Sequence, residues 1–488
     1  MGKPLLCVTV TAATTAELRR RRDEATAADL VELRLDALRD PDVMGALSGR
    51  KSPVVVTCRP RWEGGEFQGS EEERRRLLAA ALASGAEYVD VEWRARFDDL
   101  TAGPHAARVV LSMHDFEGVP DDLTSKLRAM RSTHGGFVKV AITAKRLIDC
   151  VALLDLAPEA RRSGRLVLLA MGDYGLTTRI LAGRYGSAWT YAGALRSVGQ
   201  ITAETMQNQY RFPSISDATR VYGIVGGSVR HSVSPAMHNA AFRALNLDAV
   251  YVPFPSVSAD DFVAFGRALG IAGASVTIPH KVALCDRLDE MSPGARRIGA
   301  INTIRAERGR WIGDNTDAGG FLEPLQGRVP LSGLHAAVLG AGGAARAVAD
   351  ALSSARCSVR IHARRPEQAE SVAMLTSAGV GPWPPEPGTW ELLINCTPIG
   401  YGNDETPVPA DQLTGRYVYD LVYNPPVTRL LRDAAAAGCQ TISGVDMLVA
   451  QACGQFRWWT GLRAPAGIMR AAALERLAES TREEQQVV

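Results

Sequence analysis

Several charged side chains follow apolar, strand-like runs in the first 200 residues of the chain. Each run ends in residues that can bind an ion or move a proton: Glu32, Arg34, Arg59, Glu92, His114, Asp115 and Lys139. A lysine amine can act as a nucleophile, and a histidine side chain can act as an acid or a base near neutral pH. Such a set is not expected at purely structural strand ends. The first half of the sequence therefore predicts a catalytic site.

A second group of residues has the spacing of a dinucleotide-binding loop. The loop follows an apolar run at 334–339 and fits the pattern G-x-G-x-x-A. Its residues are Gly340, Ala341, Gly342, Gly343, Ala344 and Ala345. Glycines at these positions permit a tight turn and the close approach of a pyrophosphate, and the helix that follows offers its N-terminal N–H groups. The sequence therefore predicts a dinucleotide site here.

The residues after the next strand distinguish between the two nicotinamide dinucleotides. NAD enzymes usually place an acid about 20 residues after the glycines, where it holds the ribose 2′-hydroxyl. Here the strand at 358–361 is followed by His362, Ala363, Arg364 and Arg365, with no acid. Guanidinium groups suit a 2′-phosphate, so Arg364 and Arg365 favour NADP(H) as the cofactor.

The elements that would position the first group alternate regularly. Strands are expected at about 5–10, 29–35, 54–59, 88–93, 108–114, 137–142, 165–171 and 189–194, with helical stretches such as 71–84 and 145–162 between them. Eight β-then-α repeats predict a (β/α)8 TIM barrel over residues 1–212. In that fold the chemistry lies at the C-terminal ends of the strands, which is where the charged residues stand.

The rest of the chain is predicted to contain a linker and two further α/β units. Residues 213–221 are expected to form the linker, and residues 222–325 an α/β substrate-binding domain. Residues 326–444 are expected to form a Rossmann-type NADP-binding domain around the glycine loop. The last segment, 445–488, is expected to pack back on the middle unit and complete it.

Composition narrows the class of protein. Apolar residues make up 46% and charged residues 22%, and the net charge is +2, so no nucleic-acid or membrane partner is expected. The eight cysteines form no CxxC and no Cys/His cluster, which predicts neither a metal site nor a disulfide framework. A start without a leader pattern predicts a cytoplasmic protein. Its oligomeric state stays open.

The second half of the sequence resembles shikimate dehydrogenases. The resemblance is carried by motifs in the family order at 226–239, 276–281, 299–303, 313–320, 395–398, 420–425 and 444–452. It implies that Lys281 and Asp317 form the catalytic pair and that Ser232 and Ser234 bind the substrate carboxylate. It also implies roles for other residues of these motifs: Thr277, Asn302, Tyr423 and Gln451 at the substrate, and Thr397 and Gly444 at the cofactor. Reduction of a ketone needs a proton donor beside the forming alkoxide and a hydride from the nicotinamide, and Lys281 suits the first role.

The first half resembles type I 3-dehydroquinate dehydratases over about residues 4–205. Matching motifs lie at 31–36, 58–65, 112–116, 138–141 and 172–179. The resemblance implies that Lys139 forms a Schiff base with the substrate ketone, whose iminium is an electron sink. His114 would then remove and return a proton, with Glu63 orienting it. Substrate-binding roles are implied for Glu32, Arg34, Arg59, Arg179 and Gln200.

One loop departs from the family pattern. Type I dehydratases usually carry Ser-Ala-Pro-Gly-Gln over the bound substrate, whereas this chain has Arg196, Ser197, Val198, Gly199 and Gln200. Because Gln200 is retained and proline is not, we expect this loop to slow dehydration without abolishing it.

Together the two resemblances predict a bifunctional shikimate-pathway enzyme. It would dehydrate 3-dehydroquinate to 3-dehydroshikimate and then reduce that product to shikimate with NADPH. Two alternatives stay open: an active dehydrogenase fused to a catalytically weakened barrel, and an NAD-dependent quinate dehydrogenase. Ser232, Ser234 and the arginines after strand 358–361 disfavour the second alternative.

Overall fold

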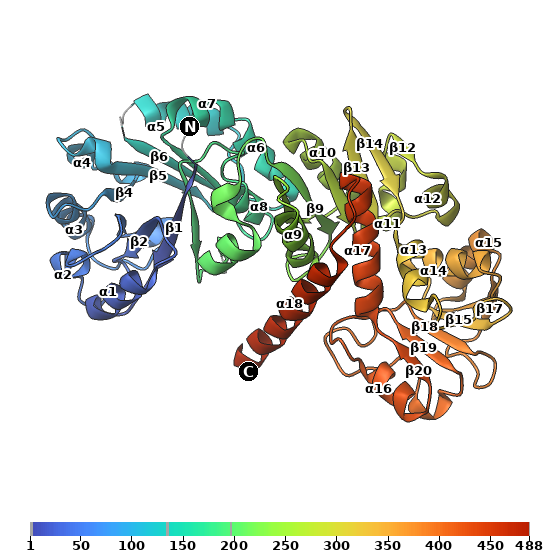
Figure 1. Cartoon of the computed structure of the whole chain (residues 1–488). Coiled ribbons are helices and arrows are strands. Elements are labelled where there is room, and N and C mark those ends of the chain that lie inside the picture. The colour runs from blue at the N-terminus through green and yellow to red at the C-terminus, as the bar shows by residue number, and fades with distance from the viewer. Residues whose placement is uncertain (1–2, 133–135, 196–197, 488) are drawn as a thin grey trace. The chain divides into compact units, whose positions relative to one another are not determined.

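The structure is a computed structural model that describes residues 3–132, 136–195 and 198–487, with side chains described up to residue 479. The chain divides into two compact units. The first runs to Thr219 and includes the short segments Phe254–Val257 and Ala264–Leu269, and the second contains the remaining residues. In Figure 1 the ribbon of residues 3–219 runs from blue into green, and β9 and α9 of the second unit continue in green.

The described part of the first unit contains eight parallel strands, and the expected barrel is confirmed. The strand order is β7-β6-β5-β4-β3-β2-β1-β8, and the ring approaches closure where the Ala188 N–H donates to the Leu166 carbonyl at 2.7 Å. Each strand lies within about two residues of its predicted bounds. The bounds are β1 (Leu5–Val10), β2 (Leu30–Arg34), β3 (Val54–Thr57), β4 (Tyr88–Glu92), β5 (Val109–Asp115), β6 (Phe137–Thr143), β7 (Leu166–Met171) and β8 (Trp189–Gly193).

The barrel interior is apolar at one end and charged at the other. Alternate residues of a strand point to the same side, so one parity of each strand fills the interior. At the N-terminal end of the strands the aromatic rings of Tyr88, Phe137 and Trp189 pack with centroids 4.8–5.6 Å apart. Two residues further along β4 and β6, the same parity brings in Asp90 and Lys139, both buried. The charged layer of the interior therefore lies next to an aromatic layer.

The helices of the first unit follow the predicted order with one correction. Helix α3 begins at a capping box of Ser70 and Glu73 and covers most of the expected stretch 71–84. The stretch 145–162, predicted as one helix, is broken into three short pieces. Pro158 in the first turn of α7 explains the last break, because proline has no N–H and crowds the carbonyl of the preceding turn. Bounds are α1 (Thr15–Glu24), α2 (Val43–Leu47), α3 (Glu71–Ala83), α4 (Asp98–Thr101), α5 (Leu123–Ser132), η4 (Leu147–Cys150), α6 (Val151–Leu154), α7 (Ala157–Ser163) and α8 (Leu176–Ile180).

The second unit contains a mixed sheet and a parallel sheet. The mixed sheet has the order β10-β9-β11-β13-β14-β12, in which β13 and β14 form an antiparallel pair. Strand β9 begins at Arg220, so the last two residues of the expected linker 213–221 belong to it. The end of β10 and the second half of α10 are counted with the first unit. Bounds are β9 (Arg220–Gly226), β10 (Ala249–Pro255), β11 (Gly273–Val276), β12 (Glu290–Met291), β13 (Thr303–Glu307) and β14 (Arg310–Asp314), with helices α9 (Ser234–Ala244), α10 (Ala259–Leu269), α11 (His280–Ala283), α12 (Pro293–Ile298) and α13 (Asp317–Leu322).

The parallel sheet has the strand order of a dinucleotide-binding fold. Its order, β17-β16-β15-β18-β19-β20, is 3-2-1-4-5-6 in sequence, and the order reverses between β15 and β18. Ligands of such sheets bind beyond the carboxyl ends of the strands at this reversal. Bounds are β15 (His335–Leu339), β16 (Ser358–His362), β17 (Gly379–Gly381), β18 (Leu392–Asn395), β19 (Tyr417–Asp420) and β20 (Gln440–Ile442), with helices α14 (Gly343–Ser354), α15 (Pro366–Thr376) and α16 (Arg429–Ala436).

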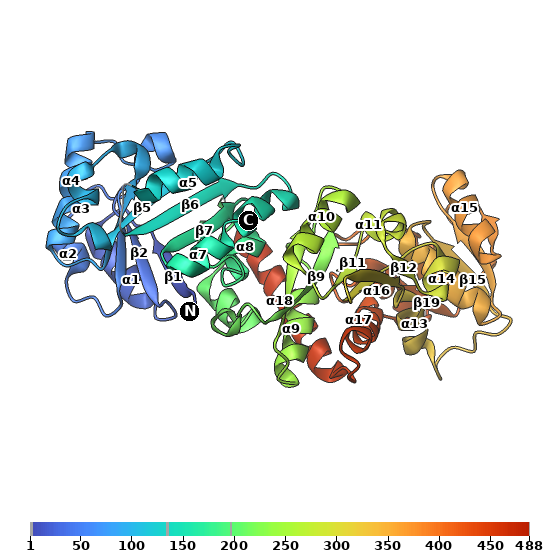
Figure 2. The ribbon, with the colours of Figure 1, turned by 90° about the horizontal axis from the view of Figure 1, so that it is seen from above.

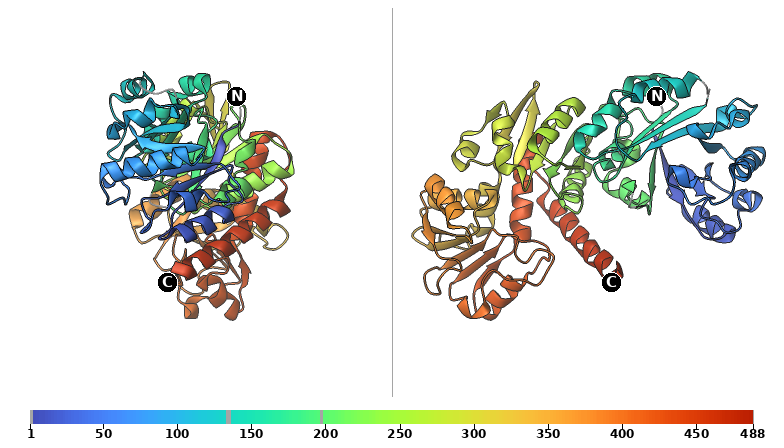
Figure 3. Two further views of the ribbon diagram at one scale, coloured as in Figure 1. Left: turned by 90° about the vertical axis from the view of Figure 1, so that its left-hand side faces the viewer. Right: turned by 180° about the vertical axis from the view of Figure 1, so that it is seen from behind.

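Helix α17 (Gly444–Thr460) joins the two sheets of the second unit. It starts against the backbone that follows β19, and near its other end the Trp459 indole donates to the Ile304 carbonyl of β13 at 3.0 Å. In Figures 1 and 3 it is the red helix that runs between the two sheets. Helix α18 (Ala466–Val487) packs beside α9, as Figure 2 shows from above. No helix among the described residues combines the length and the apolar character needed to cross a bilayer.

Candidate active sites

The side chain of Lys139 lies inside the barrel in an ion pair with Asp90. The Lys139 Nζ is 2.7 Å from Asp90 Oδ2, and both side chains are buried. Asp90 Oδ1 lies 2.9 Å from Nη2 of Arg59 and accepts the Ser112 hydroxyl at 2.6 Å. Burial opposes ionisation of Asp90, but Arg59 and Lys139 together hold its pKa below the usual range. The lysine therefore faces a carboxylate that stays charged at neutral pH.

His114 lies on β5 beside Glu63. The strand register pairs Ser112 with Lys139, so His114, two residues further, enters the interior one layer nearer the mouth. Glu63 Oε1 accepts the backbone N–H of His114 at 3.0 Å and is 3.0 Å from Nδ1 of its ring. With Nδ1–H donated to the carboxylate, Nε2 carries the lone pair of a base.

Burial sets the protonation states of this pair. Burial, with the cations Arg59 and Lys139, lowers the pKa of His114 well below its usual range, so the imidazole is neutral at pH 7. Burial raises the pKa of Glu63 to about 7, although Arg59 opposes the shift. A neutral histidine oriented by an acid that ionises near neutrality is equipped to accept a proton.

Glu32 and Arg34 lie on β2 at the barrel mouth, each held by neighbours. Glu32 accepts the hydroxyls of Thr9 and Thr57, both at 2.9 Å. Arg34 makes a two-pronged contact with Asp36 at 2.9 and 2.8 Å. These fixed side chains border the same interior as Lys139, because residues of one parity on parallel barrel strands face one space.

Arg179 is a buried cation whose hydrogen-bonding capacity is incompletely used. Its Nη2 donates to the Val198 carbonyl at 2.6 Å, but its Nε is buried without a partner among the described residues. Burial lowers the pKa of Arg179 to about 10. The amide oxygen of Gln200 is likewise buried and unpartnered within the described chain. Arg179 suits an anionic group of a ligand, because a buried charge without a full set of partners is costly, and the Gln200 oxygen suits a hydroxyl donor.

The altered loop is only partly described. Arg196 and Ser197 lie outside the described residues, and the predictions about them are not tested. Val198 donates its N–H to the Leu195 carbonyl at 3.3 Å, a bond that the family's proline could not make. Gln200 donates to the Thr9 hydroxyl at 3.2 Å, which keeps its amide inside the barrel mouth.

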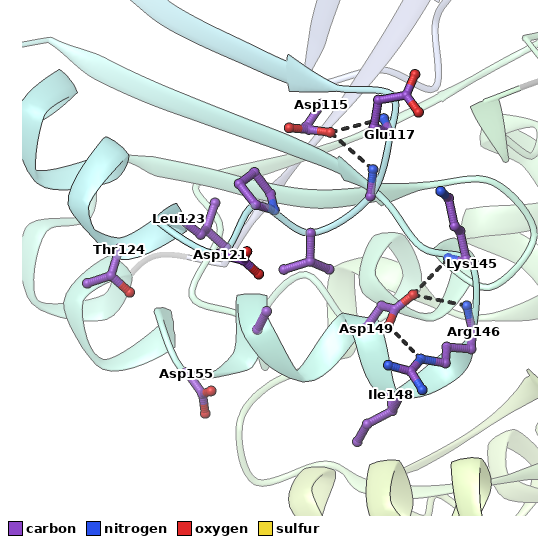
Figure 4. A pocket seen from close by; sticks show the side chains of 14 residues that line it. Asp115, Glu117, Asp121, Leu123, Thr124, Lys145, Arg146, Ile148, Asp149 and Asp155 are labelled. Carbon is purple, nitrogen blue, oxygen red and sulfur yellow. Dashed lines mark hydrogen bonds and ion pairs between the residues drawn. The ribbon is translucent and has the colours of Figure 1, made fainter.

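A separate hollow lies beside the barrel mouth, between the segments that follow β5 and β6 (Figure 4). Of the strand-end residues singled out from the sequence, its lining includes Asp115 alone. Asp115 accepts the backbone N–H groups of Glu117 and Gly118, each at 3.0 Å. Asp149 accepts those of Lys145 and Arg146 at 2.9 and 3.1 Å. These carboxylates shape the loops that surround the mouth.

The second lysine–aspartate pair lies in the second unit. Lys281 stands in α11 directly after β11, and its Nζ makes a hydrogen bond to Asp317 Oδ2. The other oxygen of Asp317 accepts the Asn302 amide at 2.8 Å. A Cβ at Gly343, the first residue of α14, would lie 3.1 Å from the Lys281 side chain. The mixed sheet and the glycine loop of the parallel sheet therefore meet at Lys281.

The other predicted substrate ligands come from several elements of the second unit. Asn302 also donates to Gln451 Oε1 at 3.3 Å, and a Cβ at Gly320 would collide with Gln451, so helices α13 and α17 touch here. Ser232 accepts the N–H of Ser234 at 3.2 Å at the start of α9. Thr277 directly follows β11 and lies against Gly226. Tyr423, whose pKa burial raises, packs edge-on against Tyr401 at 5.8 Å after β19.

The glycine loop has the shape that a dinucleotide needs. Gly340 has φ +103°, which favours glycine, and a Cβ there would lie 3.2 Å from Thr397 Cγ2. A Cβ at Gly342 would meet nothing within 4 Å, so space is open on that side. Within the described part of the chain no side chain caps α14, so its first N–H groups can bind a phosphate. The residues present therefore fit a pyrophosphate.

The remaining residues predicted at the cofactor lie around the same strand ends. Arg364 and Arg365 follow β16 and are exposed, as a guanidinium must be to reach a 2′-phosphate. Thr397 follows β18 and donates its hydroxyl to Asn395 at 2.6 Å. Gly444 opens α17, where a Cβ would lie 2.5 Å from the Val422 carbonyl. Ala341 and Ala344 complete the loop between β15 and α14.

Sequence reasoning missed several residues that hold these sites. Asp90 is the ion-pair partner of Lys139, and Ser112 donates its hydroxyl to Asp90. In the second unit, Thr316 accepts the Asn302 amide at 2.8 Å. A signal for Asp90 was present, because Asp90 and Glu92 alternate in an otherwise apolar strand and must face one side. Within the described residues no cluster of ligating side chains could hold a metal ion, and the described cysteines are all free thiols.

Comparison with protein families covers most of the chain. The model of the family described as Type I 3-dehydroquinase matches residues 6–217. The model described as Shikimate dehydrogenase substrate binding domain matches residues 224–304, and the model described as Shikimate 5'-dehydrogenase C-terminal domain matches residues 444–474.

Individual relatives are similar to the whole chain or to its second half. The bifunctional 3-dehydroquinate dehydratase/shikimate dehydrogenase of Arabidopsis thaliana, a chloroplastic protein, is 35% identical over 480 residues, covering 90% of this chain and 78% of the relative. The NADP(+) shikimate dehydrogenase of Thermococcus kodakarensis is 41% identical over 268 residues, covering 54% of this chain and 98% of the relative. The crystal structure of Thermus thermophilus shikimate 5-dehydrogenase with NADP(H) and shikimate is 38% identical, with a TM-score of 0.50, and covers 53% of this chain and 99% of that one.

Proposed function

Because the chain belongs to the family of bifunctional 3-dehydroquinate dehydratase/shikimate dehydrogenases, we propose that it catalyses two successive reactions. The barrel, residues 1–212, dehydrates 3-dehydroquinate to 3-dehydroshikimate through a Schiff base on Lys139. The domain at 222–325, completed by 445–488, binds that product. The domain at 326–444 binds NADPH, which reduces 3-dehydroshikimate to shikimate.

The observation that carries the first reaction is the lysine buried inside the barrel near a neutral histidine. Lys139 forms the C–N bond to the substrate ketone, and water leaves. His114, oriented by Glu63, removes the proton on the adjacent carbon while the iminium accepts the electron pair. The proton then returns to the leaving hydroxyl. Arg179 pairs with the substrate carboxylate, and Arg34, Glu32, Arg59 and Gln200 surround the ring.

The second reaction depends on the contact between Lys281 and Asp317. NADPH, when bound, supplies the hydride. Lys281 donates a proton to the ketone oxygen as the alcohol forms, and Asp317 holds the ammonium in place. Asn302 fixes the second oxygen of Asp317, so the lysine has a defined direction. Ser232 and Ser234 bind the substrate carboxylate, while Thr277, Asn302, Tyr423 and Gln451 contact the rest of the substrate.

The cofactor assignment rests on the residues after β16. This position has no acid that could hold a 2′-hydroxyl. It has two exposed arginines instead. Gly340 to Ala344, Thr397 and Gly444 line the pyrophosphate and nicotinamide side of the strand ends. Relatives of the second half are named for NADP(+), which agrees with this assignment.

Separate assays of the two half-reactions test the proposal. The purified chain is given 3-dehydroquinate without cofactor, and the formation of 3-dehydroshikimate is followed. In a second assay it is given 3-dehydroshikimate with NADPH or NADH. The proposal expects turnover in both assays and a preference for NADPH. A barrel without turnover would support the weakened-barrel alternative, and faster oxidation of quinate with NAD than of shikimate with NADP would support a quinate dehydrogenase.

A further inference from the structure

Asp90 binds two cations with one carboxylate at the centre of the barrel. One oxygen is 2.7 Å from the Lys139 Nζ, and the other is 2.9 Å from Arg59 Nη2. The Ser112 hydroxyl donates to the second oxygen at 2.6 Å. Asp90 has no exposed surface, so water does not compete for these contacts. The carboxylate therefore has a fixed position against the lysine nitrogen.

A series of ion pairs with alternating charge connects this carboxylate to helix α3. Arg59 Nη1 lies 2.5 Å from Glu92 Oε1, and Glu92 in turn contacts Arg74 of α3. Arg74 is fully buried, pairs with Glu71 at 2.7 Å and lies 4.7 Å from the centre of the Phe97 ring. Because each member is held on two sides, Asp90 and Arg59 cannot turn away from the lysine without breaking several buried ion pairs.

The proposed reaction changes the charge on the lysine nitrogen in a defined order. An ammonium and a ketone give an iminium and one water: the nitrogen keeps one hydrogen and its positive charge, and two hydrogens leave with the carbonyl oxygen. Loss of the proton from the adjacent carbon moves the electron pair to nitrogen, which becomes neutral. Expulsion of the hydroxyl with a proton restores the iminium, and water then releases the product. The nitrogen is thus positive, neutral and positive again.

We infer that Asp90 is a further catalytic residue of the barrel, whose carboxylate pairs with the Lys139 nitrogen first as ammonium and then as iminium. This inference rests on the proposed function, because it needs the Schiff base on Lys139. A fixed anion at hydrogen-bond distance favours the iminium over the neutral carbinolamine that precedes it.

Arg59 lowers the free-energy cost of the intermediate in which the Lys139 nitrogen is neutral. When the nitrogen loses its charge, a carboxylate with one cation would be left buried and unpaired, which is costly. Asp90 keeps the guanidinium of Arg59 on its second oxygen throughout. The second cation therefore reduces the penalty for withdrawing charge from nitrogen, and one carboxylate serves both the charged and the neutral stages.

Borohydride trapping of the imine in Asp90→Asn tests the inference. Wild-type and variant chains are mixed with 3-dehydroshikimate and borohydride, and the fraction carrying the reduced adduct is measured by mass. Removing an opposite charge this close changes a charge-dependent equilibrium by about 10-fold or more. We therefore expect the trapped fraction and kcat to fall about 10-fold or more, with a smaller change in KM. Glu87→Gln, which removes an ion-paired carboxylate near the start of β3, is the matched control and should trap like wild type.

The outcomes separate this inference from the function on which it rests. Absence of a Lys139 adduct in the wild-type chain would overturn both. A wild-type adduct with equal trapping and equal kcat in Asp90→Asn would overturn only the role of Asp90.

If Asp90→Asn fails to fold, the crystal structure of the wild-type reduced adduct decides. The inference requires the Asp90 carboxylate within hydrogen-bond distance of the substituted Lys139 nitrogen, and a carboxylate paired with Arg59 alone would contradict it.

Discussion

The two sites of this chain each pair a lysine with an aspartate, and they differ in what surrounds the pair. The side chain of Lys139 is 4% exposed, and its partner Asp90 is shared with a second cation. The side chain of Lys281 is 15% exposed, and its partner Asp317 is held by the neutral amide of Asn302. The proposed nucleophile, whose nitrogen would change charge during the reaction, thus stands in a charged network. The proposed proton donor, which would regain its proton from solvent, has a neutral and more exposed surrounding.

The two sites also differ in how the chain assembles them. In the barrel, Asp90, Ser112 and Lys139 come from neighbouring strands of one sheet, so strand register alone brings them together. In the second unit, Lys281, Asp317 and Gly343 come from three segments on two sheets. The barrel site therefore depends on parity within strands, whereas the dehydrogenase site depends on the packing of helices such as α13 and α17.

The largest expected effect is the loss of one activity and not the other when Lys139 is replaced. Lys139→Ala removes the only nitrogen proposed to form the imine, so dehydratase activity should fall by at least about 1,000-fold. Reduction of 3-dehydroshikimate by the same protein should stay within about twofold of wild type, because Lys281 belongs to another unit. Mass spectrometry after borohydride treatment of wild type should find the adduct at Lys139. Labelling of a different lysine would contradict the assignment.

Lys281→Ala should give the reverse pattern. Loss of a general acid typically costs about 100- to 10,000-fold, so reduction should fall by that amount while dehydration is unchanged. Steady-state assays of both half-reactions on one preparation measure this directly. A variant that keeps more than a tenth of its reductase activity would show that another group protonates the ketone oxygen.

Arg364→Ala should separate the two cofactors. Loss of a charge-assisted phosphate contact costs about 1.5–3 kcal/mol, or roughly 10- to 150-fold in affinity. The KM for NADPH should rise on that scale, and the KM for NADH should hardly change. Arg360→Ala, which removes an exposed arginine within β16, is the control and should leave both values near wild type. Equal losses with both cofactors would give Arg364 a different role.

The pH dependence of dehydration should report Glu63. Its pKa is raised to about 7, and the ionised carboxylate accepts the His114 N–H groups more strongly than the neutral acid does. Because His114 is already neutral in this range, kcat/KM for dehydration should rise with pH up to about 7 and then level, losing at most about tenfold per pH unit below it. Glu63→Gln should remove this rise and lower the plateau. A profile unchanged in Glu63→Gln would assign the ionisation to another group.

The smallest expected effect concerns the altered loop. Val198→Pro would restrict the open loop, a gain of about 0.4–1 kcal/mol, but it would also remove the N–H bond to Leu195. These opposed terms should leave kcat/KM for dehydroquinate within about threefold of wild type. A loss of 100-fold or more would mean that the closed loop needs the Val198 N–H, a requirement that the family pattern does not contain.

The barrel could be predicted from the sequence because its signals are local. Each strand carries its own apolar run, and Glu32, His114 and Lys139 stand where such runs end. Asp90 lies inside its strand, so the strand-end pattern indicates only Glu92 there, although strand parity places both side chains on one side. Arg74 could not be predicted, because its run of acids and arginines looks like an exposed helix face and only packing on Glu92 and Phe97 buries it.

The dehydrogenase site was less accessible to reasoning from pattern alone. The glycine loop and the arginines after β16 have a physical signature, and the strand order 3-2-1-4-5-6 agrees with it. Lys281 and Asp317 stand in short loop-to-helix segments without periodicity, so only family resemblance singled them out. Their approach depends on Gly320 and Gly343, where the absence of a side chain lets distant segments touch. Such long-range fits are not encoded in any local pattern.

The central claim is that one chain carries two independent sites acting in sequence. Complementation between the two lysine variants tests it most directly, with 3-dehydroquinate and NADPH as the only reagents added. Wild type should oxidise one NADPH for each dehydroquinate consumed, Lys139→Ala alone and Lys281→Ala alone should oxidise almost none, and an equimolar mixture of the two should restore oxidation. A mixture that stays inactive while each variant keeps its other half-reaction, or a single variant that oxidises NADPH with dehydroquinate, would contradict the account.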